Sequence, residues 1–120
     1  MKKIILGTSE LTVSEICLGT MNFGWKEPQE NSIERLEQYV GSGGNFIDTA
    51  NVYSRREAEG MDFYGKDFDK YVDGTSERLI GNWVKDKELI VVIILYSYDS
   101  KNSHHHFQLG IFQHHLYLSL

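Results

Sequence analysis

Apolar and polar positions follow two different spacings along the chain, and both recur in short segments. Residues 3–6 and 11–16 are separated by a Gly-Thr-Ser-Glu stretch, which predicts a β-hairpin. Apolar runs at residues 16–19, 45–47 and 89–95 predict three further strands. The last run consists of leucine, isoleucine and valine alone, which is typical of a strand buried on both faces of a sheet.

Two helices are predicted between these strands. Asn31 and Glu34 have the spacing of a capping box, and an apolar face follows over residues 32–40. Thr75 or Ser76 is expected to cap the second helix. The apolar face of that helix comprises Leu79, Ile80, Trp83 and Val84. Strands that alternate with helices predict an α/β fold with a parallel sheet.

Glycines at positions 41, 43 and 44 follow the first predicted helix. Helices commonly end on a residue in the left-handed conformation, which glycine adopts readily, so the cluster predicts a helix terminus. A phosphate-binding loop is the alternative. Such a loop follows a strand and opens a helix, whereas this cluster precedes a strand, and we assign no phosphate site to it.

The overall charge limits the classes of partner. Twelve basic against seventeen acidic residues give a net charge of −5, the wrong sign for a chain that binds nucleic acid through phosphates. The longest apolar run is far shorter than the roughly 20 residues that span a bilayer, so we expect a cytoplasmic chain without membrane contact. The single cysteine, Cys17, stands between Ile16 and Leu18 and is expected to be a buried structural thiol.

Two segments differ from the rest in composition. Residues 54–73 are dense in charge with interspersed aromatic residues, which predicts an enlarged, solvated loop. All five histidines fall within residues 96–120, where apolar residues recur without helix caps or turns. We expect residues 1–95 to form the folded part and the tail to be disordered or unrelated to it. No metal site is expected, because adjacent histidines on an extended chain point in different directions.

A carboxylate and a phenol follow the strand predicted at residues 45–47. Asp48 comes directly after it, and Tyr53 ends the hexapeptide Asp-Thr-Ala-Asn-Val-Tyr. Because α/β folds place their chemistry at the carboxyl ends of parallel strands, both residues are site candidates. Taken alone, a turn or cap role for the aspartate and a packing role for the tyrosine are more frequent.

Two further motifs change this assessment: Leu-Gly-Thr-Met-Asn-Phe-Gly at residues 18–24, and Ser-Glu followed by Ile-Gly, Trp and Lys at residues 76–85. With the hexapeptide, they resemble the N-terminal part of the aldo-keto reductase family, over about residues 3–92. Relatives with a Leu-Gly-Thr-Met stretch are often aryl-alcohol dehydrogenases or NADP-dependent oxidoreductases. The resemblance implies an incomplete (β/α)₈ TIM barrel, with the N-terminal hairpin, about three strands and two helices, since such barrels need about 250 residues.

The resemblance also assigns roles to residues. Tyr53 would be the general acid that protonates a carbonyl oxygen while a nicotinamide delivers hydride to the carbon. Asp48 would pair with the family's catalytic lysine and contact the nicotinamide ribose. The turn of Gly19, Thr20 and Met21 would contact the same ribose. NADP is thus the implied cofactor, and a small carbonyl compound is the implied substrate. A free phenol has a pKa of about 10, so a nearby cation is needed for proton exchange at neutral pH.

Two of the family's four catalytic residues have no counterpart. The lysine would stand at the end of the strand at residues 89–95, but Lys87 precedes that strand and Lys101 lies beyond it. The family's histidine motif is also missing, because the run from His104 to His106 stands in unrelated sequence. Three strands would leave both sheet edges open, so self-association through the apolar strand is expected.

Two functional hypotheses remain open. The first is an NAD(P)H-dependent aldo-keto reductase fragment, a carbonyl reductase by descent that is inactive alone. The second is a non-catalytic interaction module derived from such a reductase, in which residues 54–73 or an open sheet edge bind a partner.

Overall fold

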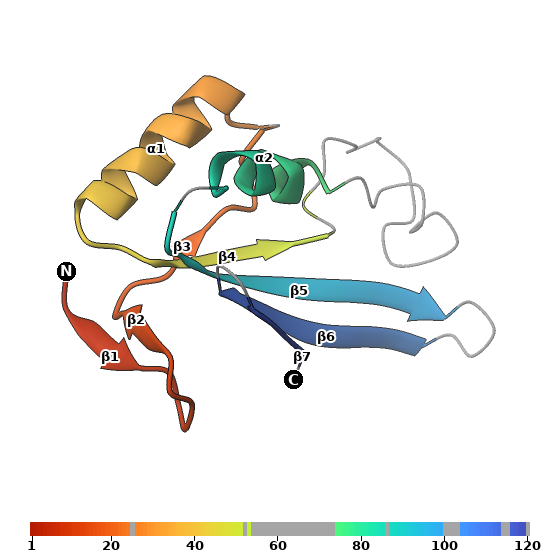
Figure 1. Ribbon diagram of the computed structural model, residues 1–120. Helices are drawn as coiled ribbons and strands as arrows, with labels where there is room; N and C mark the ends of the chain where they lie inside the picture. The colour runs from red at the N-terminus through yellow and green to blue at the C-terminus, as the bar shows by residue number, and fades with distance from the viewer. Residues whose placement is uncertain are drawn as a thin grey trace.

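The computed structural model describes residues 1–24, 26–51, 53, 74–85, 87–99, 104–113 and 116–119. Within these ranges the chain forms a two-stranded hairpin, a five-stranded sheet and two helices (Figure 1). The strands are β1 (Lys3–Ile5), β2 (Thr12–Ser14), β3 (Leu18–Gly19), β4 (Phe46–Ala50), β5 (Ile90–Asp99), β6 (His104–Gln113) and β7 (Leu116–Ser119). The helices are α1 (Gln29–Gly41) and α2 (Thr75–Trp83). The predicted loop at residues 54–73 and Lys101 lie outside the described residues.

The larger sheet has the strand order β3-β4-β5-β6-β7. β3, β4 and β5 run parallel to one another, and α1 and α2 connect them in sequence. The predicted α/β class with a parallel sheet is therefore confirmed for this part. β6 and β7 then continue the sheet in antiparallel fashion, which makes the sheet mixed.

The end of the chain differs from the expectation of a disordered tail. β5 continues to Asp99, and β6 pairs with it along its whole length, from Ile90 opposite Gln113 to Asp99 opposite His104. β5 is thus paired on both sides, by β4 and β6, and the prediction of an open β5 edge is wrong. Unpaired amides of an apolar strand need partners, and the next segment of chain supplies them by folding back.

The predicted N-terminal hairpin is confirmed. β1 and β2 pair antiparallel, with Lys3 opposite Ser14, and the hairpin lies on the opposite side of the sheet from the helices (Figure 1). A small apolar cluster joins it to the sheet and consists of Leu11, Val13, Ile90, Val92 and Ile111. The hairpin therefore covers one end of the sheet face that the helices leave open.

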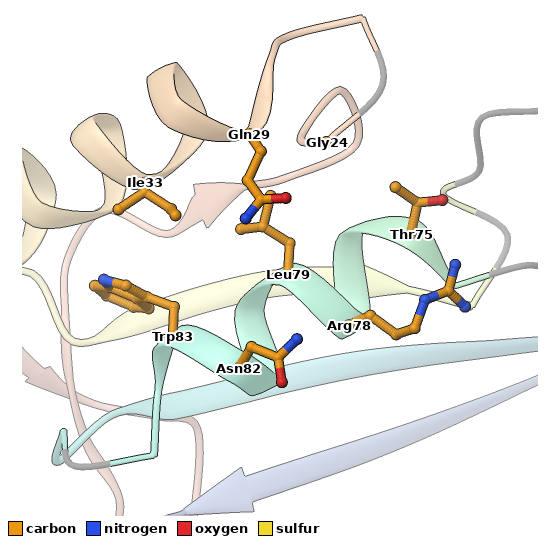
Figure 2. A pocket seen from close by; sticks show the side chains of 8 residues that line it. All are labelled: Gly24, Gln29, Ile33, Thr75, Arg78, Leu79, Asn82 and Trp83. Atoms are coloured by element: carbon orange, nitrogen blue, oxygen red, sulfur yellow. The ribbon is translucent and has the colours of Figure 1, made fainter.

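The two helices cover the other face of the sheet (Figure 1). Trp83 at the end of α2 donates a hydrogen bond of 2.6 Å to Glu37 of α1. The ammonium of Lys87 lies 3.3 Å from the same carboxylate oxygen and 4.8 Å from the centroid of the Trp83 ring. A cleft of about 510 Å³ lies between the helices (Figure 2). It is lined by Gly24, Gln29, Ile33, Thr75, Arg78, Leu79, Asn82 and Trp83.

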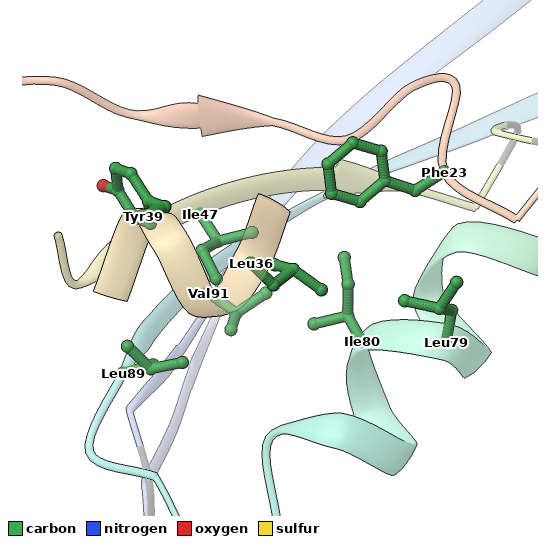
Figure 3. Close-up of a cluster of buried hydrophobic side chains, with 8 residues drawn as sticks. All are labelled: Phe23, Leu36, Tyr39, Ile47, Leu79, Ile80, Leu89 and Val91. Atoms are coloured by element: carbon green, nitrogen blue, oxygen red, sulfur yellow. The ribbon is translucent and has the colours of Figure 1, made fainter. Parts of the chain in front are cut away.

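The main core lies between the helices and the parallel strands (Figure 3). Ile47 of β4 and Leu36 of α1 are fully buried. The other members of this cluster are Phe23, Tyr39, Leu79, Ile80, Leu89 and Val91. Neither helix is long enough or apolar enough to cross a membrane, as far as the described residues show.

Both helices begin without the predicted side-chain caps. α1 begins directly after Pro28, whose ring fixes φ at a value suited to a helix start. The predicted capping box is therefore wrong, because Asn31 and Glu34 lie inside the helix. α2 begins after Gly74, which adopts a φ of +58°, and neither of the predicted caps, Thr75 or Ser76, caps it.

The predicted helix terminus at the glycine cluster is confirmed. Gly43 adopts a φ of +87°, and its amide donates a 2.8 Å hydrogen bond to the carbonyl of Val40. Gly44 is needed for a different reason. A Cβ atom there would lie 2.4 Å from the ring of Tyr39. The Tyr39 hydroxyl in turn lies 2.7 Å from the Ile16 carbonyl oxygen, so the aromatic ring is held in place.

Candidate active site at the ends of two parallel strands

The candidate site lies where β3 and β4 end. Gly19, the last residue of β3, is in register with Asp48 of β4. Thr20 follows β3, and its amide and hydroxyl both donate to the main-chain carbonyl of Asp48, at 3.1 and 2.8 Å. Asp48 belongs to β4 rather than following it, since the strand continues to Ala50. These bonds join the two strand ends into one unit.

Asp48 and Tyr53 lie within hydrogen-bond distance of each other. The Tyr53 hydroxyl donates to Asp48 Oδ1 over 3.4 Å, and both side chains are half-buried. The Tyr53 amide donates to the carbonyl of Ala50 over 3.1 Å, which turns the chain back after β4. The two residues predicted to be catalytic are therefore brought together.

The electrostatics of the pair favour the protonated form of both groups. Burial raises the pKa of the Asp48 carboxyl, and the hydrogen bond from Tyr53 opposes this in part. Burial and the adjacent Asp48 charge raise the pKa of the Tyr53 phenol. Among the described residues, no cation contributes to either shift. The phenol is thus a weaker acid than a free tyrosine, which is the opposite of what general acid catalysis needs.

An aliphatic side chain faces the pair from the next strand. Val92 of β5 is in register with Asp48 and is 8% exposed. Lys87 precedes β5 and contacts Glu37 on the outer helical layer. His106 pairs with Ser97, which is five residues beyond Val92 and therefore roughly 16 Å further along the strand. Neither of these residues supplies the charge or the acid that the resemblance requires.

Three buried hydroxyl side chains connect the candidate site to α2. The Ser76 hydroxyl, in the first turn of α2, donates to the Thr20 carbonyl over 2.9 Å and lies 2.9 Å from Thr20 Oγ1. It accepts a hydrogen bond of 3.3 Å from the hydroxyl of Thr49. All three side chains are at most 1% exposed. The start of α2 is therefore fastened to the ends of both β3 and β4.

The predicted cofactor residues divide into two kinds. Gly19 is exposed, and a Cβ atom added to it would meet nothing within 4 Å, while Met21 is 53% exposed. Asp48 is half-buried. Thr20 differs from the expectation, because its side chain is fully buried and its amide and hydroxyl are already bonded to Asp48. Its side chain joins the strands and is not available to a ligand.

Cys17 is exposed, and the prediction of a buried thiol is wrong. Leu18 packs against the core between helices and sheet. The side chain of the adjacent Cys17 therefore points the other way. Partial desolvation and then the charge of Asp48 raise the pKa of the Cys17 thiol to about 11. The thiol therefore stays protonated at neutral pH.

Sequence reasoning missed the contribution of Thr49 and Ser76. Serine at the start of a helix is usually a cap, so the sequence predicts that Ser76 bonds to its own helix. The signal that points elsewhere is the set of small hydroxyl residues that end both strands. Such residues bond across strand ends when an apolar helix buries them, but one sequence does not reveal which groups meet.

Taken together, the parallel strands and the paired carboxylate and phenol at their carboxyl ends define an α/β protein with a candidate acid–base site. The sequence model of the Aldo/keto reductase family matches residues 15–108. The chain therefore belongs to the aldo/keto reductase family.

Individual relatives agree with this assignment. Norsolorinic acid reductase of Aspergillus flavus is 33% identical over 93 residues, which cover 72% of this chain and 19% of the relative. An aryl-alcohol dehydrogenase [NADP(+)] of Phanerodontia chrysosporium is 35% identical over 98 residues, or 72% of this chain and 21% of the relative. The uncharacterized oxidoreductase YrpG of Bacillus subtilis is 34% identical over 83 residues, or 69% and 21%. The chain spans about a fifth of the length of these relatives.

Proposed function

We propose that the chain is the opening segment of an NADP-linked carbonyl reductase and is inactive as an isolated polypeptide. The observation that carries the proposal is the Tyr53 hydroxyl bonded to Asp48 at the carboxyl end of a parallel strand. In this proposal the units from β3 to β5 are the first of an eight-stranded barrel, which the hairpin closes from below. The chain would act in the cytoplasm.

The chemistry assigned to the site is the reduction of a small carbonyl compound to an alcohol. When bound, a reduced nicotinamide supplies the hydride. In this proposal Tyr53 donates its phenolic proton to the carbonyl oxygen, and the phenolate that remains regains a proton from water. Gly19, Met21 and Asp48 would hold the nicotinamide ribose; Gly19 and Met21 are exposed, and Asp48 is half-buried.

Inactivity follows from the charge around Tyr53. A phenolate forms next to a carboxylate in a partly desolvated position, and both effects raise its free energy. A cation beside the phenol would offset them, but Val92 occupies the adjacent position on β5. Loss of one member of a catalytic group commonly costs several orders of magnitude in rate.

Two measurements test the proposal. Oxidation of NADPH by an aromatic aldehyde should be no faster with the purified chain than with Tyr53→Phe. A turnover that Tyr53→Phe abolishes would contradict the proposed inactivity. Nicotinamide mononucleotide at millimolar concentration should shift the amide resonances of Gly19 and Met21, and adenosine monophosphate should not. Equal shifts with both nucleotides, or none with either, would contradict the ribose site.

The same electrostatics support a second candidate function, that of a non-catalytic interaction module. A site whose phenol is a weaker acid than free tyrosine is better suited to binding than to proton transfer. Residues 54–73, which lie outside the described residues, would supply the contact surface. Deleting these residues should then abolish binding to a specific partner and leave the thermal transition of the remaining chain in place.

A further inference from the structure

We infer that Ser76 is a positioning residue, which sets the place of the Tyr53 phenol relative to the Asp48 carboxylate. The inference deepens the proposed function, on which it rests for the role of the pair. The geometric basis is a set of hydrogen bonds that connect Ser76 to the main chain of both residues, directly for Tyr53 and through Thr20 for Asp48.

The connection to Tyr53 is direct. The Ser76 amide, in the first turn of α2, donates to the Tyr53 carbonyl over 3.4 Å. The Tyr53 amide is bonded to Ala50 at the end of β4. The main chain of Tyr53 is therefore held at its amide by the strand and at its carbonyl by the helix, which fixes the origin of its side chain.

The connection to Asp48 passes through Thr20. The Ser76 hydroxyl donates to the Thr20 carbonyl, and the Thr20 hydroxyl and amide both donate to the Asp48 carbonyl. Thr49, next to Asp48 on β4, donates to the Ser76 oxygen. One hydroxyl thus fixes β3 and β4 at the level of the carboxylate.

A role in helix formation does not explain this serine. Alanine forms helices better than serine does. Ser76 is also not the cap of α2, because the residue before the helix is Gly74. A buried hydroxyl destabilises the folded state unless it is hydrogen-bonded. Ser76 is 0% exposed, and its hydroxyl bonds to Thr49 of β4 and to Thr20, which follows β3. Its arrangement is suited to holding the two strand ends and Tyr53 together.

Ser32 provides a matched control. It is also 0% exposed and also lies in the first turn of a helix, where its hydroxyl donates to Pro28 over 3.0 Å. Within the described part of the chain, its hydroxyl bonds to Gly24, Glu27 and Pro28, and neither Asp48 nor Tyr53 is among these partners. Ser32→Ala therefore removes a similar buried hydroxyl without touching the pair.

The test follows the ionisation of Tyr53 in a chain labelled with ¹³C at the ζ carbon of tyrosine, with Tyr53→Phe to assign the signal. Ser76→Ala keeps the amide hydrogen bond to Tyr53 and removes the hydroxyl that holds the two strand ends. The Asp48 carboxylate should then move away from the phenol, and the pKa of Tyr53 should fall toward the ordinary value of about 10. Ser32→Ala should leave the pKa unchanged. A folded Ser76→Ala variant with the wild-type Tyr53 pKa would overturn the inference.

Thr20→Val covers the case in which Ser76→Ala does not fold. It keeps the volume of the side chain and removes the hydroxyl between Ser76 and Asp48. The same downward shift of the Tyr53 pKa is expected, and no shift would again overturn the inference. The titration uses neither cofactor nor turnover, so its failure is distinct from failure of the proposed reductase function, which the NADPH and nucleotide experiments report.

Discussion

Val92 lies directly opposite Asp48 in the register of β4 and β5, and no charge faces the carboxylate from that strand position. The aliphatic side chain of Val92 therefore supplies no base to the Asp48–Tyr53 pair. Burial raises the pKa of both groups, and the adjacent Asp48 charge raises the pKa of Tyr53 further. The pair thus lies at the ends of parallel strands, beside an uncharged position of β5.

The raised pKa of Asp48 predicts a pH dependence of stability. The folded state binds the Asp48 proton more tightly than the unfolded chain does. This contribution is full below the ordinary aspartate pKa of about 3.9 and is lost as the pH rises through the raised value. Asp48→Asn removes the titration, so the wild type should lose stability relative to this variant between about pH 4 and pH 7.

Urea denaturation at both pH values measures the effect. Glu77→Gln should behave in the same direction, because burial also raises the pKa of that carboxyl. Parallel curves for the wild type and Asp48→Asn across this range would show that the carboxyl is not desolvated in the folded chain.

The close approach of Gly44 to Tyr39 predicts a position-specific effect on stability. Gly44→Ala places a methyl group 2.4 Å from a ring whose hydroxyl is bonded, so either the ring or the main chain must shift. Overpacking of this kind costs about 1–3 kcal/mol. The midpoint of urea unfolding should fall accordingly.

Gly41→Ala is the matched control for this prediction. It lies in the last turn of α1, and a Cβ atom there meets nothing within 4 Å. Alanine is favoured over glycine in a helix by about 1 kcal/mol, so the variant should be as stable as the wild type or more so. Equal destabilisation by both substitutions would refute the collision with Tyr39.

Pairing of β5 with β6 predicts that the C-terminal strands keep the chain from aggregating. Removing residues 100–120 exposes the edge of the apolar strand β5, which can then pair with another molecule. Removing residues 115–120 alone eliminates β7 and leaves β6 on that edge. Light scattering at equal concentration should rise for the longer deletion and stay low for the shorter one. Equal scattering from the two deletions would argue against the protective role of β6.

The parallel part of the fold was accessible from sequence because its signals are local. The glycines after α1 and the unbroken apolar run of β5 each have one dominant structural meaning. The end of the chain was not accessible, because alternation of apolar and other residues in β6 is confined to residues 107–111, and β6 pairs through main-chain groups that every residue shares. β6 also covers the edge of β5 that the sequence predicted to be open.

Part of the candidate site could also be predicted from a local signal in the sequence. Asp48 and Tyr53 could be predicted together because a family motif contains both. Ser76 could not be predicted as their support, since its partner Thr20 follows β3, far from α2 in the sequence, and only the folded chain brings them within 2.9 Å. The absence of a lysine from β5 was apparent from the sequence, but the effect of Asp48 on the pKa of Tyr53 required the distance between the two side chains.

Titration of Tyr53 in the wild type and in Asp48→Asn tests the pairing of these two residues most directly. With ¹³C at the ζ carbon of tyrosine, the wild-type phenol should ionise above the ordinary tyrosine pKa of about 10. Asp48→Asn should lower that value without bringing it below the ordinary one, because burial of the phenol remains. A Tyr53 pKa that is already at or below about 10 in the wild type, or that Asp48→Asn leaves unchanged, would contradict the pairing.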